Sequence, residues 1–255
     1  MAWRRIGTGG REAHVNRIRT EWVRAGAWVR YGPVAATCLG LRPRQTYGRG
    51  VTGAAGLVGD ALLFRGWRNS AWDVRLPLDA VRRVSLVTVR LRLRRRVRAL
   101  TVHGDTPDGW RVTTLIGPAL ADLGAALAEA CDLPLHDAGD GRDDFGPDRA
   151  LRLWQDIYGE WHADRTADLY LAPDRLLFDW RAVAPLAALQ RLDVHQMGRD
   201  RALLRVTYAG PDGALQVEGF EVRGARRWAE ALVRQRDVPL EVHRGRKRKP
   251  DLSDY

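Results

Sequence analysis

Arginines form the main concentration of chemically capable side chains in this chain. Eight of them fall within seventeen residues: Arg82, Arg83, Arg90, Arg92, Arg94, Arg95, Arg96 and Arg98. On a strand, Arg90, Arg92 and Arg94 project from one face, about 6.5–7 Å apart. Guanidinium groups at that spacing suit nucleic-acid phosphates or crowded lipid headgroups. The pattern predicts a docking surface for an anionic partner.

Two other interpretations of the arginine run stay open. A solvated, self-repelling edge strand uses such charges to block sheet-to-sheet aggregation. Alternatively, the arginines neutralise acidic residues of the same chain, in its second half or in the segment 136–149.

No set of residues predicts a reaction, a cofactor or a metal ion. The glycines of 48–53 match G-x-G-x-x-G, but they precede a predicted strand, whereas a dinucleotide site needs a helix there. The six histidines lack zinc-ligand spacing, and the aspartates of 136–149 lack the alternation of a calcium loop. We therefore expect a protein without catalytic residues, cofactor or metal site. An enzyme with a site between the two halves of the chain is the remote alternative.

The elements that position the arginines occur twice. Residues 59–64, Gly-Asp-Ala-Leu-Leu-Phe, recur as 173–178, Pro-Asp-Arg-Leu-Leu-Phe. Three further landmarks follow in the same order: 76–84 with 184–192, 106–109 with 210–213, and 132–135 with 237–240. Such order and spacing indicate two copies of one small domain. We expect an N-terminal helical extension (1–44), a basic first domain (45–135), an acidic Gly-rich linker (136–149), a mildly acidic second domain (150–240) and a basic flexible tail (241–255).

Each copy is predicted to be mostly strands closed by a helix. In the first, strands at 51–58, 61–67, 81–93, 97–103 and 110–116 precede a helix near 120–131. In the second, strands at 167–171, 176–180, 189–194, 203–208 and 215–222 precede a helix over 224–235. An amphipathic helix at 11–30 is expected to pack on the protein's own core, with a membrane or partner as alternatives. A short helix at 148–158 is its expected counterpart.

Charge separates the two halves. Residues 1–130 hold 22 arginines against 9 acidic residues, a net charge of +13, whereas residues 131–255 hold 20 basic and 22 acidic residues, a net charge of −2.

The two cysteines lack paired spacing, which argues against a disulfide-stabilised secreted protein. The N-terminus lacks a signal-peptide pattern, and no apolar stretch is long enough to span a bilayer. We expect a cytoplasmic protein, with peripheral attachment at the inner membrane face left open.

The sequence pattern of both copies resembles that of the bacterial PH-like and GRAM-like domains of the pleckstrin-homology superfold. The resemblance rests on residues 60–64 with 76–84, and on 174–178 with 184–192. It implies a mainly β protein with helices (α+β): two tandem half-open barrels, each closed by a C-terminal amphipathic helix. It also implies binding of lipid headgroups, peptides or proteins. The phosphoinositide type places basic residues in the first hairpin loop, here expected at 59–60 and 173–174, where no basic pair occurs.

The sequence therefore predicts a non-catalytic binding or scaffolding module. Its basic first copy would dock an acidic protein or an anionic membrane surface, and its second copy would be structural or protein-binding. The expected contact set is Arg82, Arg83, Arg90, Arg92, Arg94, Arg95 and Arg96. The alternative is an RNA- or DNA-binding protein that uses the 90–98 run and the basic tail.

Overall fold

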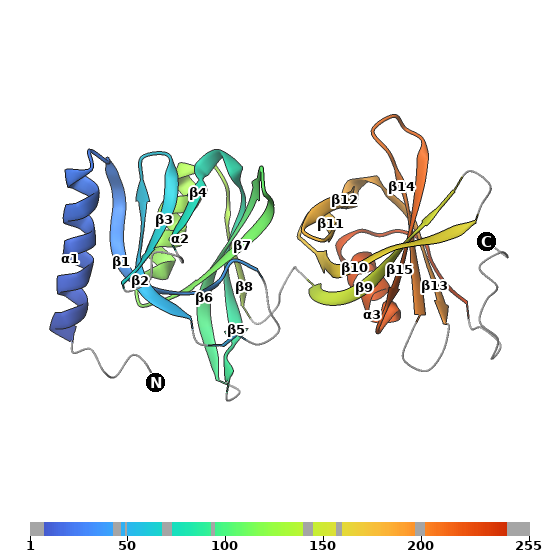
Figure 1. Cartoon of the computed structure of the whole chain (residues 1–255), viewed down its shortest axis with the longest axis horizontal. Helices are drawn as coiled ribbons and strands as arrows, with labels where there is room; N and C mark the ends of the chain where they lie inside the picture. Colours follow the sequence, from blue (N-terminus) through green and yellow to red (C-terminus); the bar gives the residue numbers. More distant parts are fainter. Residues whose placement is uncertain are drawn as a thin grey trace. The chain divides into compact units, whose positions relative to one another are not determined.

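A computed structural model shows two units with the same order of elements, residues 1–142 and 143–255 (Figure 1). It describes residues 8–42, 47–48, 50–67, 73–92, 95–139, 145–156, 160–196 and 202–243. The basic run of the expected tail and residues 140–144 of the expected linker lie outside these ranges. Within them the fold is mainly β with three α-helices, as the sequence predicts.

The first unit begins with a helix and continues as an eight-stranded sheet. Its elements are α1 (Thr8–Arg24), β1 (Val29–Gly40), β2 (Val51–Val58), β3 (Ala61–Gly66), β4 (Val74–Pro77), β5 (Val81–Arg90), β6 (Arg96–Thr106), β7 (Gly109–Ile116), α2 (Leu120–Ala130) and β8 (Leu135–Gly139). The strand order is β4-β3-β2-β1-β7-β6-β5-β8. All neighbours are antiparallel except β5 and β8, which pair in parallel.

The second unit repeats this plan without the leading helix. Its elements are β9 (Phe145–Gln155), β10 (Trp161–Leu171), β11 (Arg175–Phe178), β12 (Arg181–Pro185), β13 (Leu189–Gln196), β14 (Ala202–Ala209), β15 (Leu215–Val222), α3 (Ala225–Gln235) and β16 (Leu240–His243). The order β12-β11-β10-β9-β15-β14-β13-β16 matches the first sheet strand for strand. Each sheet is open, because its order has two ends.

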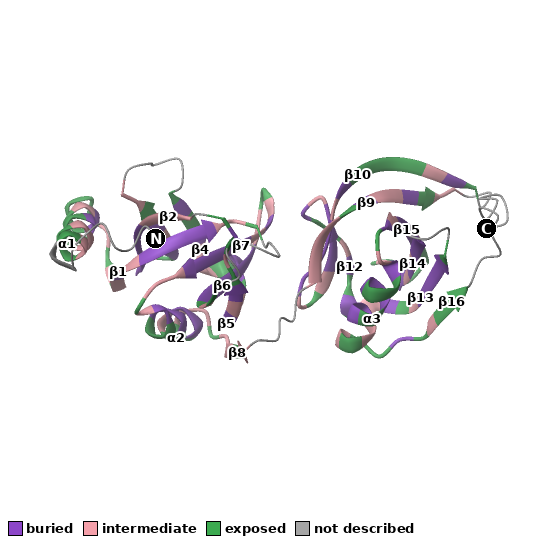
Figure 2. Cartoon of the chain, turned by 90° about the horizontal axis from the view of Figure 1, so that it is seen from below, coloured by how far each residue is buried: buried purple, intermediate pink, exposed green. Residues whose placement is uncertain are grey.

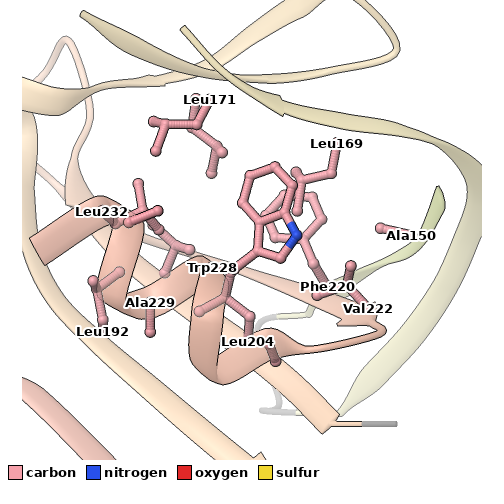
Figure 3. Close-up of a cluster of buried hydrophobic side chains, with 14 of the residues drawn as sticks. Ala150, Leu169, Leu171, Leu192, Leu204, Phe220, Val222, Trp228, Ala229 and Leu232 are labelled. Carbon is pink, nitrogen blue, oxygen red and sulfur yellow. The ribbon is translucent and has the colours of Figure 1, made fainter. Parts of the chain in front are cut away.

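The two copies bury equivalent faces. In the first, Leu123 and Leu127 of α2 are fully buried among the strands; in the second, Trp228 and Leu232 of α3 take those places. Figure 3 shows Trp228 at the centre of the second core. Its indole Nε1–H donates to a carboxylate oxygen of Asp148, 2.9 Å away. The periodicity of both closing helices therefore predicted their buried faces.

Helix α1 covers the outer face of β1 and β2. Its buried side chains, Ile18 and Trp22, pack with Ala54 and Val58, while most of the helix is exposed (Figure 2). Packing on the protein's own sheet, as expected, is confirmed. The helix ends at Arg24 rather than at residue 30, because Gly26 adopts a left-handed backbone with φ of +74°.

Six strands lie where the sequence pattern predicted none: β1, β4, β8, β9, β12 and β16. Strand β1 lies within the expected helical extension, and β9 replaces the helix expected over 148–158, so that helix prediction was wrong. Both are central strands: β1 bonds to β2 and β7, and β9 bonds to β10 and β15. Two ladders of backbone hydrogen bonds outweigh local helix preference. Strands β8 and β16 fall partly in the expected linker and tail. Both are short and polar edge strands, so their sequences lack the apolar alternation that predicts a strand.

A candidate anion-docking site on the first unit

The arginine run lies on the hairpin that joins β5 to β6. Arg90 ends β5 and is the ladder partner of Arg96, which begins β6. Between them, the Leu91 N–H donates to the Arg95 carbonyl at 2.7 Å and closes the turn. Arg90, Arg92, Arg95 and Arg96 are exposed, whereas Arg94 lies outside the described residues. We call residues 90–98 the arginine hairpin.

The hairpin differs from the strand that the sequence predicted. Strand β5 ends at Arg90, so Arg92 belongs to the connection rather than to a strand face shared with Arg90. The edge-strand interpretation is wrong as well, because β5 lies between β6 and β8. Charge repulsion gives the reason for the early end: consecutive arginines separate more easily in a turn that faces water than along one strand face.

A second basic segment reaches the arginine hairpin from the connection between β1 and β2. The Tyr47 N–H donates to the Arg90 carbonyl at 2.9 Å, and the Arg92 N–H donates to the Tyr47 carbonyl at 3.1 Å. Tyr47 is fully buried, and its hydroxyl lies 3.1 Å from the Thr114 hydroxyl. This buried anchor fixes Tyr47, within the β1–β2 connection, against the hairpin.

The two segments together concentrate positive charge. Residues 41–50 contain three arginines and residues 90–98 contain six, and neither segment contains a carboxylate. The two segments meet at the Tyr47–Leu91 bridge although they are forty residues or more apart in sequence. Arg44, Arg49 and Arg94 lie outside the described residues. The sequence pattern predicts the first hairpin at 51–67 and therefore leaves the 41–50 segment out of the site. Arg42, Arg44 and Arg49 in a Gly- and Pro-containing stretch were the available signal.

Arg82 and Arg83 do not join this group. They lie at the opposite end of β5, and eight residues of strand separate Arg82 from Arg90 by about 26 Å. The Arg82 guanidinium donates to the backbone carbonyls of Asp79 and Val81, at 2.6 and 3.3 Å. Arg83 is half-buried and donates to the Ser85 hydroxyl at 3.2 Å. The structure therefore separates the predicted contact set into two places.

One arginine of the hairpin is neutralised within the unit. Arg98 on β6 forms an ion pair with Asp137 on β8. The Arg98 side chain, followed by the Gly139 N–H, lowers the pKa of the Asp137 carboxyl. Asp137 belongs to the segment expected as an acidic linker, so the interpretation of internal neutralisation applies to Arg98.

The equivalent region of the second unit has the opposite chemistry. The connection between β9 and β10 brings Asp156 and Glu160 beside His162, whose Nε2 lies 2.9 Å from an Asp156 carboxylate oxygen. Trp154, which is 46% exposed, stacks on the His162 ring with 4.7 Å between centroids. The second copy thus presents an acidic and aromatic edge where the first presents arginines.

A buried charge network joins the last strand of the second unit to its sheet. The Asp193 side chain is fully buried on β13 and accepts hydrogen bonds from Arg191 and Arg205, each at 3.0 Å. His243 of β16 stacks on His195 with 4.3 Å between ring centroids. Burial, with the neighbouring His243 next, lowers the pKa of His195 to about 4. Because Asp193 is already bonded to two guanidinium groups, the network suits a structural role.

No protein-family model matches the chain, and no curated protein is significantly similar to it in sequence. Within the described ranges, no helix combines the length and apolar character needed to cross a membrane.

Proposed function

We propose that the protein is a non-catalytic binding or scaffolding module that docks an acidic protein or an anionic membrane surface through the arginine hairpin. One observation carries the proposal: Tyr47 of the β1–β2 connection is hydrogen-bonded to the backbone of Arg90 and Arg92 in the arginine hairpin. In sequence, the 41–50 and 90–98 segments that meet at this contact contain nine arginines and no carboxylate. Self-repulsion makes such a concentration unfavourable in isolation, and an anionic partner relieves it.

The fold supports a module of the pleckstrin-homology-like kind. Seven antiparallel strands followed by a helix agree with the resemblance seen in the sequence. With β1 included, the first hairpin loop of the first unit is residues 41–50 rather than 59–60. Basic residues therefore occur in the loop where the resemblance expects them. The two half-open barrels and the tandem family assignment are part of this proposal.

The contact set is refined to the exposed part of the arginine hairpin. Arg90, Arg92 and Arg95 form no ion pair with a carboxylate among the residues that the structure describes. Arg82 and Arg83, about 26 and 23 Å away along β5, bond to their own unit and are assigned a structural role.

A charge-matched pair of variants tests the proposal. In the first, Arg90, Arg92 and Arg95 are replaced by Gln; in the second, the exposed Arg181, Arg223 and Arg236 of the second unit are replaced by Gln. Both lower the formal net charge from +11 to +8. Binding is measured at low salt to poly-glutamate, to vesicles containing phosphatidylserine and to duplex RNA and DNA.

We expect the hairpin variant to lose binding to poly-glutamate or to the vesicles, and the control variant to retain it. If both variants bind as the unmodified protein does, the arginine hairpin is not the docking site. If only nucleic-acid binding depends on the hairpin, the protein is a nucleic-acid-binding module instead.

A further inference from the structure

A corner between α1 and β1 exposes apolar side chains next to arginines. It comprises Val23 and Arg24 of the last helical turn, residues 25–28, and Arg30 of β1; we call it the Trp28 corner. Trp28 is 68% exposed and Val23 is 59% exposed. Trp28 is the most exposed of the tryptophans whose burial the structure describes. Exposed apolar side chains mark a binding surface when they lie together on the surface rather than singly.

The backbone holds this corner in one conformation. The Ala27 N–H donates to the Trp22 carbonyl at 3.0 Å and the Gly26 N–H to the Val23 carbonyl at 2.9 Å. With the left-handed Gly26, these two bonds form a Schellman motif that ends the helix. On the other side, the Gly59 N–H donates to the Trp28 carbonyl at 2.7 Å. Trp28 is therefore presented to solvent by a fixed backbone.

Positive charge surrounds the apolar tip. Residues 17–30 hold four arginines and one glutamate, a net charge of +3. The Arg30 guanidinium carbon lies 4.8 Å from the centroid of the Trp28 ring, a cation–π contact. Glu21 is occupied by Arg17 and Arg65, at 3.7 and 3.0 Å. Among the described residues, Arg24 and Arg30 have no carboxylate partner.

We propose that the Trp28 corner inserts into the headgroup region of an anionic phospholipid membrane. Tryptophan prefers the membrane–water interface, where its ring is buried and its N–H stays hydrated. Arginines flanking the ring bind lipid phosphates and gain from the negative surface potential. A protein partner would need about 800 Å² of surface on each side. A tip of a few small residues around one exposed tryptophan suits insertion better.

This surface is distinct from the arginine hairpin. Val29, next to Trp28, pairs with Val58 at the end of the β1–β2 pair that lies away from their connection. Cys38 pairs with Val51 at the other end, where the chain enters the 41–50 segment. The two sites therefore lie at opposite ends of the first unit, as Figure 1 shows. A membrane bound at the Trp28 corner leaves the hairpin available to an acidic protein.

Vesicle flotation of the full chain tests the inference, with phosphatidylcholine vesicles that contain or lack phosphatidylserine. We expect binding to the phosphatidylserine vesicles and a reduction of about tenfold in the partition coefficient for Trp28→Ala. Replacing Arg24 and Arg30 together by Gln should reduce it about tenfold or more. Trp154→Ala, which removes the exposed tryptophan of the second unit, is the matched control and should bind normally. Brominated lipid should quench part of the tryptophan fluorescence of the unmodified protein. That quenched part should be absent from Trp28→Phe, which lacks this indole.

The inference is overturned if the unmodified protein ignores phosphatidylserine vesicles, or if Trp28→Ala binds them as well as the control does. Replacing Arg90, Arg92 and Arg95 by Gln separates this site from the hairpin. Vesicle binding that survives this change but not Trp28→Ala supports the inference. Vesicle binding that shows the reverse pattern overturns it and leaves the proposed function standing.

Discussion

The fully buried carboxylate of Asp193 provides a sharp test of the energetics of the second unit. Its two oxygens accept hydrogen bonds from Arg191 and Arg205. In Asp193→Asn the side chain keeps its shape but loses its charge, so both guanidinium groups lose this buried carboxylate, and Arg191 keeps only its bond to Glu241. The equivalent position in the first unit is Ser85, since each residue lies opposite the last strand in the same register.

The magnitude follows from how far the two arginines can recover. Removing one member of a buried ion pair costs about 3–5 kcal/mol when the remaining charge stays buried. Here the Arg191 side chain is 42% exposed and also bonds to Glu241 at 2.6 Å, whereas Arg205 is 23% exposed. Partial hydration of both places the loss at the lower end, about 3 kcal/mol.

Hydrogen exchange of the full chain, read by mass spectrometry, measures this loss locally. A destabilisation of about 3 kcal/mol raises exchange about a hundredfold in segments whose amides exchange by unfolding of the unit. We expect that rise in β13, β14 and β16, with β5 and β6 unchanged. Ser85→Ala, the positional control, should leave the second unit unaffected. Unaltered exchange in β13 and β14 of Asp193→Asn would refute the reasoning.

Two further expectations concern the same unit. Burial lowers the pKa of His195 to about 4. Between about pH 6.5 and pH 4 the histidine therefore binds more protons in the unfolded chain than in the folded one. The free energy of unfolding should fall as the pH drops through that window, by on the order of 3 kcal/mol. His195→Phe should flatten this dependence in urea unfolding at several pH values; parallel curves would contradict it. Trp228→Phe removes the N–H that bonds Asp148 and leaves a gap in the core, which should cost about 2 kcal/mol. An unchanged urea midpoint would show that the contact contributes little.

Repetition made much of the fold predictable. The hairpin around Gly59 and the Pro-Asp-Gly turn that ends in Gly109 lie where their turn residues predicted them. Both glycines have positive φ. The closing helices followed from apolar spacing. These features depend on residues close together in sequence, which a pattern can register.

Most of the strands that the sequence pattern did not predict depend on partners far away in the chain. In β9, Ala150 and Leu153 are buried three residues apart, a spacing that imitates a helix. What makes them a strand is pairing with β10 and β15, which local sequence does not record. Strands β8 and β16 are short and polar, and each finds its parallel partner only after a helix has intervened.

The candidate site was half predictable for the same reason. The arginines of the 90–98 run were visible as composition, but the turn that ends β5 and the distance to Arg82 were not. The 41–50 segment became part of the site through Tyr47, a residue without charge. Its burial and backbone bonds depend on the folded sheet.

The salt dependence of polyanion binding tests the central claim most directly. Affinity for poly-glutamate is measured over a series of salt concentrations for the unmodified protein and the two charge-matched triple variants. Each lost ionic contact lowers the slope of log affinity against log salt. We predict a shallower slope for the variant lacking Arg90, Arg92 and Arg95, and an unchanged slope for the one lacking Arg181, Arg223 and Arg236. Equal slopes for all three proteins would contradict docking through the arginine hairpin.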